Sequence, residues 1–131
     1  MRKLKGLIIM LSILASLFSM TACSDGGANS YEQITPEQAK AIMDTEKEYI
    51  IIDARTAEEF AEGHIADAIL IPEYEIADRA EKELPDKEQL ILVYCRSGRR
   101  SKIASEELVK LGYTNVKEFG GIIDWPYKVV K

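Results

Sequence analysis

The stretch Leu90-Ile91-Leu92-Val93-Tyr94-Cys95-Arg96-Ser97-Gly98-Arg99-Arg100-Ser101 joins an apolar run to a polar loop that contains one thiol and three arginines. Residues 90–94 are apolar without alternation, which predicts a strand buried on both faces, as in a parallel sheet. Residues 101–111 have the apolar spacing of a helix, which Gly112 ends. We therefore expect the thiol of Cys95 at the end of a strand and at the mouth of a tight loop, with a helix N-terminus behind it.

The rest of the chain repeats this alternation of strand and helix. The run Tyr49-Ile50-Ile51-Ile52 ends at Asp53 and predicts a second buried strand. A helix start precedes it, because Thr35 can cap a helix, Pro36 suits the first helical position and Gln38 completes a capping box. Other segments predict strands at 31–34, within 65–71 and at 116–119, helices at 56–60 and 74–83, and a final turn or helix opened by Gly120-Gly121. The sequence thus predicts a single α/β domain with a mostly parallel central sheet flanked by helices.

The N-terminus is typical of a bacterial secretory signal. Arg2, Lys3 and Lys5 form a short basic region, residues 6–20 are apolar and uncharged, and small residues precede Cys23. This order resembles the lipoprotein type, in which the cysteine is lipidated with acyl chains such as palmitate and becomes the mature N-terminus. We therefore expect a signal peptide at 1–22, lipidation of Cys23, a flexible tether at 23–30 and the domain at 31–131.

Two alternatives for the N-terminus stay open. The run from residue 6 to residue 23 is just long enough for an uncleaved membrane anchor, which needs about 18 apolar residues, and an ordinary cleaved signal is the other. All three place the domain outside the cytoplasmic membrane, because the basic residues stay inside. We expect an extracytoplasmic protein that is held by the lipid on Cys23 to the cell membrane or the outer membrane.

The charge of the domain limits its partners. Removal of residues 1–22 leaves 14 basic against 22 acidic residues, a formal net charge of -8. Such a balance argues against nucleic acid or an anionic lipid surface as the partner of the domain itself. The basic residues at 96–100 are therefore a local feature. We expect a monomer without a cofactor.

Cys95 is the residue on which the chemistry depends. The chain has two cysteines, and lipidation of Cys23 would leave Cys95 without a partner for an internal disulfide. Its thiol is then either buried and inert or reactive. A helix N-terminus and neighbouring arginines favour a thiolate and an anionic ligand, and Gly98 permits the positive φ of a tight cradle.

Two other residue types bear on this site. Asp53 and Cys95 both follow predicted strands, so their side chains could face one crevice at the carboxyl ends of the sheet. A Cys-His pair with His64 is a weaker alternative, because Gly63-His64-Ile65 indicates a structural turn. We expect no metal site, since one cysteine and one distant histidine do not make a ligand set.

Four segments together resemble a rhodanese-like (sulfurtransferase) domain. They are residues 51–60, with Asp53-Ala54-Arg55, residues 62–72, with Gly63-His64-Ile65, the loop 95–101, and residues 120–125, from Gly120-Gly121 to Trp125. The resemblance covers residues 31–131. Asp67 departs from it, because the family usually has Gly there, and we expect a local change of the turn rather than lost activity.

The resemblance implies a sulfurtransferase that moves a sulfane sulfur from thiosulfate or a related donor to a thiophilic acceptor. Cys95 would be the nucleophile and would carry the sulfur as a persulfide. The substrate-binding residues would be Arg96, Ser97, Gly98, Arg99 and Arg100, through backbone N–H groups and guanidinium charge. Loop support would come from Asp53, Arg55 and Ser101. The partner would be a small anionic donor, such as thiosulfate or polysulfide, or the persulfide of another protein.

Two rival functions differ in class. A thiol phosphatase needs Cys-x5-Arg, but Ser101 stands at that position; the arginine at Arg100 makes a tighter loop that suits sulfur better than phosphate. A non-turnover persulfide carrier, or a thiol redox sensor or binding module at the cell envelope, would use Cys95 without free catalysis.

Overall fold

The computed structural model describes residues 30–131. The predicted signal peptide, the predicted lipidation of Cys23 and the predicted tether up to residue 29 lie outside these residues. Within the described part of the chain, no helix is long and apolar enough to cross a membrane.

A five-stranded sheet in the order β1-β5-β4-β2-β3 forms the centre of the molecule. The strands are β1 (Glu32–Gln33), β2 (Ile50–Asp53), β3 (Ile69–Leu70), β4 (Ile91–Cys95) and β5 (Val116–Gly121). The helices of the described residues are α1 (Pro36–Thr45), α2 (Ala57–Glu62), α3 (Ile76–Glu83) and α4 (Arg99–Lys110), with 3-10 turns η1 (Glu73–Glu75) and η2 (Ile122–Asp124). Every strand pair is parallel. The structure therefore confirms the predicted α/β fold.

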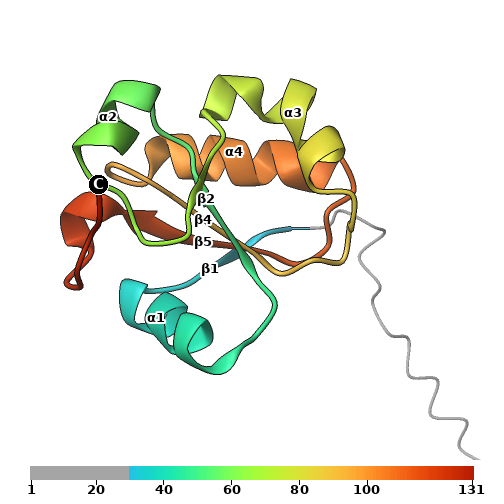
Figure 1. Ribbon diagram of the computed structural model, residues 1–131. Helices are drawn as coiled ribbons and strands as arrows, with labels where there is room; N and C mark the ends of the chain where they lie inside the picture. The colour runs from blue at the N-terminus through green and yellow to red at the C-terminus, as the bar shows by residue number, and fades with distance from the viewer. Residues whose placement is uncertain (1–29) are drawn as a thin grey trace, which may run out of the picture.

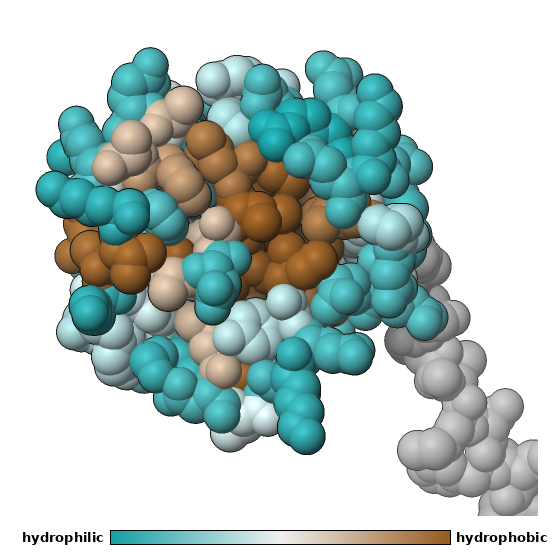
Figure 2. All heavy atoms as spheres, viewed as in Figure 1, coloured by the Kyte–Doolittle hydropathy of each residue, from teal (hydrophilic) through white to brown (hydrophobic). Residues whose placement is uncertain are grey.

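The helices cover the sheet on both faces. Figure 1 shows α1 on one side and α2, α3 and α4 on the other. Side chains alternate along β4, so that Leu92 and Tyr94 join the core beneath α1, whereas Val93 and Cys95 join the core beneath α4. Figure 2 shows apolar residues at the centre of the face in view and hydrophilic residues around them.

Local signals explain where the helices begin. The hydroxyl of Thr35 accepts a hydrogen bond from the Gln38 N–H, and the Gln38 side chain accepts one from the Thr35 N–H, so the predicted capping box is present. Thr56 accepts a hydrogen bond from the Glu59 N–H and caps α2. Such caps satisfy backbone donors that a helix leaves unpaired.

The segments next to the cysteine loop differ from the prediction. Helix α4 starts at Arg99, two residues before the predicted start, because Gly98 takes the cap position with φ 106°. Strand β5 continues through Gly120 and Gly121 instead of ending at residue 119, and Gly121 pairs with Cys95. The final turn therefore follows these glycines rather than beginning at them.

The other differences lie at the edges of the sheet. The strand predicted within residues 65–71 is Ile69–Leu70, which pairs with β2 but is not buried on both faces as expected, because it lies at the edge of the sheet. The predicted helix 74–83 divides into η1 and α3. Asp67 has a φ of 67°, a left-handed backbone that favours glycine and that Asp tolerates. The departure from the resemblance at Asp67 therefore leaves a positive φ in the turn.

Candidate active site

Cys95 ends β4 and is 1% exposed. The N–H of Gly98 donates a hydrogen bond to Cys95 Sγ at 3.0 Å. The left-handed backbone of Gly98 turns the loop back on the sulfur, which a residue without a Cβ does without strain. The loop thus brings the N-terminus of α4 to Cys95, as predicted, and the unpaired N–H groups there favour a negative charge.

Ser101, in the first turn of α4, ties this loop to β5. Its Oγ lies 3.3 Å from Cys95 Sγ and donates to Glu118 Oε1 at 2.7 Å. Glu118 is only 3% exposed, and the same oxygen accepts a hydrogen bond from the N–H of Gly120 at 2.8 Å. The chain of contacts Cys95–Ser101–Glu118 therefore connects β4, α4 and β5 beneath the loop.

Gly121 lies where the cysteine loop packs against β5. A Cβ placed on Gly121 would overlap the carbonyl group of Arg96. Its backbone is ordinary, with φ -126° and ψ 155°, so the site requires space rather than an unusual conformation. The N–H of Ile123 donates to the same Arg96 carbonyl at 3.3 Å. Strand β5 and the turn after it therefore hold the loop from outside.

Asp53 forms a buried ion pair beside the site. Its carboxylate accepts hydrogen bonds from Arg55 Nη2 at 2.7 Å and from the Tyr94 hydroxyl at 2.6 Å. Arg55 Nη2 also donates to the carbonyl of Gly63 at 2.7 Å. Burial, followed by the charge of Asp53, raises the pKa of Tyr94, which keeps this hydroxyl protonated as a donor. Asp53 and Arg55 therefore brace the segment before β3, and no hydrogen bond among the described residues joins either of them to the loop 96–100 that they were expected to support.

Arg100 is held by Glu59 across the site. Its Nη1 and Nη2 donate to the two carboxylate oxygens at 2.7 and 2.9 Å. The hydrogen bond from Arg100 lowers the pKa of Glu59 to about 2. Because the folded pKa lies below the ordinary value, the pair is fully formed above about pH 4.3 and is lost only as the pH falls through that lower value.

A pocket of about 340 Å³ opens beside the loop. It is lined by Arg55, Glu59, Glu62, Arg96, Arg100, Ile122 and Ile123. Three of its residues are cationic, but Arg55 and Arg100 already have carboxylate partners. Arg96 is exposed and has no salt bridge within residues 30–131.

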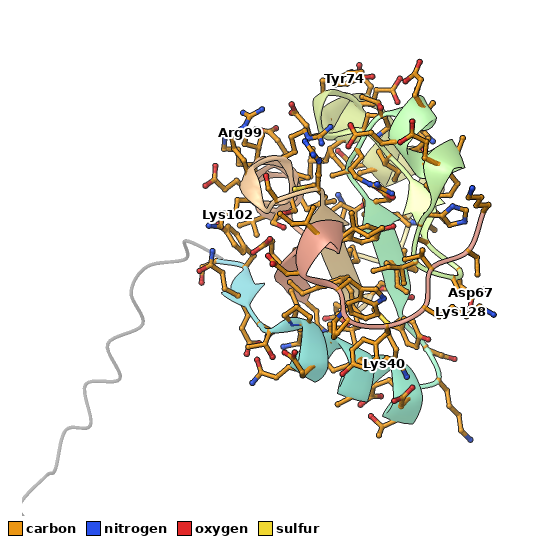
Figure 3. The ribbon with its side chains drawn as sticks, turned by 90° about the vertical axis from the view of Figure 1, so that its left-hand side faces the viewer. Lys40, Asp67, Tyr74, Arg99, Lys102 and Lys128 are labelled. Atoms are coloured by element: carbon orange, nitrogen blue, oxygen red, sulfur yellow. The ribbon has the colours of Figure 1, made fainter. Side chains whose placement is uncertain are left out.

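The predicted site residues do not all meet in this pocket. Arg99 points outward from α4, on the same outer side as Lys102 (Figure 3). Ser97 and Gly98 line a different depression, on the side of Glu118. Asp53 is paired in register with Tyr94 and does not line the pocket beside the loop. Its ion-pair partner Arg55 lines that pocket instead.

His64 is structural, as its sequence context indicated. Its ring stacks on Phe60 with centroids 3.7 Å apart, and its backbone pairs with Val130. Its Nδ1 lies 2.9 Å from the carbonyl oxygen of Phe60. The polar contacts of the Cys95 sulfur are instead with Gly98 and Ser101, so the alternative of a Cys-His pair has no support in the geometry.

Sequence reasoning missed two acidic residues of the site. Glu59 pairs with Arg100, 41 positions away, and no local pattern links the two residues. Glu118 was missed altogether. Its position two residues after the buried Val116 could have placed it on the inward face of β5, since side chains on one face of a strand recur every second residue.

Comparison with known proteins agrees with this arrangement of loop, sheet and helix. The sequence profile of the Rhodanese-like domain family matches residues 35–126. The chain belongs to the rhodanese-like domain family. Thiosulfate sulfurtransferase PspE of Escherichia coli strain K12 is 40% identical to this rhodanese-like domain protein over 80 residues, which are 61% of this chain and 77% of the relative. The putative sulfur carrier protein YrkF of Bacillus subtilis is 33% identical over 106 residues, 80% of this chain and 56% of that protein.

Solved structures show the same fold. A rhodanese with anions from E. coli matches with a TM-score of 0.60 and 38% identity, covering 63% of this chain and 98% of that one. A rhodanese-like domain protein from Staphylococcus aureus matches with a TM-score of 0.66 and 32% identity, covering 74% and 93%.

The contact between Gly121 and Arg96 gives a prediction about stability. We expect Gly121→Ala to lower the free energy of unfolding by about 3 kcal/mol and to change the rate at which iodoacetamide modifies Cys95, because the new methyl group displaces the loop. Gly120→Ala is the matched control. It places a Cβ in open space at φ 88° and should cost only about 1 to 2 kcal/mol of backbone strain. Equal losses in urea denaturation would contradict the packing argument.

Proposed function

We propose that this protein is a rhodanese-type sulfurtransferase in which Cys95 carries sulfane sulfur as a persulfide. The observation that carries the proposal is the position of Cys95 Sγ. It lies at the end of β4, accepts a hydrogen bond from the Gly98 N–H, and faces the N-terminus of α4. Membership of the family and its relatives named as sulfurtransferases support the same reaction class.

The proposed cycle has two displacements at sulfur. The Cys95 thiolate attacks the outer sulfur of thiosulfate, the S–S bond of the donor breaks, and sulfite leaves with the electron pair. A thiophilic acceptor then attacks the terminal sulfur of the persulfide, and the Cys95 thiolate leaves. Backbone N–H groups of the loop and of the α4 N-terminus stabilise the terminal sulfur anion. Each step conserves charge and needs no oxidant or reductant.

The test of this cycle is the mass of the protein. We expect the purified chain, incubated with thiosulfate, to gain one sulfur atom that maps to Cys95, and cyanide to remove it as thiocyanate. Cys95→Ser is the control and should do neither. Equal release of thiocyanate by the wild type and Cys95→Ser would disprove the proposal.

A persulfide carrier is the second candidate. The burial of Cys95, at 1% exposure, favours it, because a buried sulfur exchanges slowly with acceptors in solution. One relative is named as a putative sulfur carrier protein. In the mass experiment, a stable persulfide that forms without catalytic turnover would identify the carrier.

The pocket gives a prediction about donor binding. Because Glu59 competes for the guanidinium of Arg100, we expect Glu59→Gln to lower the KM for thiosulfate about threefold and Arg100→Ala to raise it by at least as much. The exposed neighbour Glu58 does not line the pocket, so Glu58→Gln should leave KM unchanged. A higher KM in Glu59→Gln would mean that Glu59 orients Arg100 for binding instead of competing with the donor.

We also propose that Cys23 anchors the protein outside the cytoplasmic membrane, on the basis of the N-terminal sequence pattern alone. Mass spectrometry of the membrane-bound wild type should find a mature N-terminus at Cys23 that carries acyl chains. A wild-type chain that keeps residues 1–22 and carries no acyl chain would instead favour the uncleaved anchor.

A further inference from the structure

Glu118 is a buried carboxylate that the transfer steps do not use. It lies on β5, is 3% exposed, and has no salt bridge within residues 30–131. A buried charge of this kind is costly unless hydrogen bonds compensate it. Its Oε1 accepts two, from the hydroxyl of Ser101 and from the N–H of Gly120. The burial of Glu118 below the catalytic loop therefore needs an explanation.

The hydroxyl of Ser101 has one proton and several possible acceptors. Its Oγ lies 2.7 Å from Glu118 Oε1, 3.0 Å from the Gly98 carbonyl oxygen and 3.3 Å from Cys95 Sγ. A carboxylate is the strongest acceptor in this set and also the nearest. The proton of Ser101 is therefore directed to Glu118, away from the sulfur.

This direction decides what Ser101 offers to Cys95. With its proton on the Glu118 side, the hydroxyl presents a lone pair to the sulfur. A lone pair accepts a hydrogen bond from a protonated thiol but repels a thiolate. The carboxylate of Glu118 adds a second repulsion in an interior where charges are poorly screened. Both effects oppose ionisation of Cys95.

Other polar and charged groups either favour ionisation of Cys95 or lie further from its sulfur. The Gly98 N–H and the α4 N-terminus favour the thiolate. The hydrogen bond to Glu59, followed by the charges of Glu59 and Cys95, raises the pKa of Arg100. Lys102 and Asp124 line the same depression as Glu118. Burial, then Glu106, then Glu118 raise the pKa of Tyr31, which flanks β5. The protonation state of Cys95 thus depends on a balance between its two sides.

We propose that Glu118 is a positioning residue which, by holding the proton of Ser101, keeps the unloaded Cys95 in its protonated thiol form. The inference rests on the proposed role of Cys95 as the reacting sulfur. Loading with sulfur removes the repulsion between Cys95 Sγ and the Ser101–Glu118 pair. Sγ then has no proton, and the negative charge moves to the terminal sulfur, about 2 Å further out. Glu118 therefore favours the loaded protein over the free thiolate.

The test compares Glu118→Gln with the wild type in a pH titration of the thiolate, followed by its ultraviolet absorbance. The same titration of Cys95→Ser supplies the background from Cys23. We expect the thiolate to form at lower pH in Glu118→Gln, and iodoacetamide to modify Cys95 at least about fivefold faster at pH 7. Glu106→Gln removes an equal charge from the exposed face of α4 and should leave both measurements unchanged.

An unchanged titration in Glu118→Gln would reduce Glu118 to a purely structural residue and overturn the proposal. A thiolate that forms only at higher pH would also overturn it, because Glu118 would then be accepting the proton of Cys95.

Ser101→Ala keeps the proposal testable if Glu118→Gln does not fold. The proposal predicts that the thiolate forms at lower pH in Ser101→Ala, since the thiol loses its acceptor and the thiolate loses nothing. A thiolate that forms only at higher pH in Ser101→Ala means that Ser101 donates to the thiolate, and one that forms at the same pH means that Ser101 does not influence Cys95. Either result overturns the proposal. These titrations need no sulfur donor, so a failure of persulfide loading would disprove the proposed function without affecting them.

Discussion

Strand β4 is paired on both edges and buried on both faces, and the positions of the other parts follow from this. Its partners β2 and β5 are parallel to it, so the carboxyl ends of all three lie at one edge of the sheet. The chain must leave β4 at that edge and turn into α4 within a few residues. Cys95, at the last position of the strand, is therefore fixed by backbone pairing on either side, while the loop after it supplies the polar contacts. The rigid part of the site is the strand, and the adaptable part is the set of side chains around the pocket.

The parts that could be predicted from the sequence are those with a local signal. Continuous apolar runs identified β2 and β4, and the capping residues Thr35 and Thr56 identified the starts of α1 and α2. The loop chemistry around Cys95 was also local. The pairs Arg100–Glu59 and Ser101–Glu118 could not be found in this way, because they join residues 41 and 17 positions apart. The extension of β5 through two glycines was missed for a similar reason, since propensity disfavours glycine in strands. The Arg96 carbonyl explains the glycine at 121, and the positive φ of 88° explains the glycine at 120.

The charges of the site are balanced more closely than the three arginines of the loop suggest. Arg55 is neutralised by Asp53 and Arg100 by Glu59, and Arg99 faces outward. Among the described residues, Arg96 is therefore the one arginine of the pocket without a carboxylate partner, and the N–H of Gly98, which points to Cys95 Sγ, lies on the other side of the loop. Oriented dipoles of this kind stabilise an anion without the desolvation cost of a buried charge. Such a site selects an anion by where its negative charge lies more than by how much charge it carries.

The contact between Gly121 and Arg96 also limits how this protein can evolve. The loop and β5 touch backbone against backbone, so there is no side chain between them that could shrink to make room. An insertion that enlarged the loop for a bulkier anion would have to shift β5 at the same time, and β5 is the only partner of the edge strand β1 among the described residues. A single mutation cannot supply both changes. New substrates are therefore more accessible through the exposed side chains at the pocket rim, such as Ile123, than through the length of the loop.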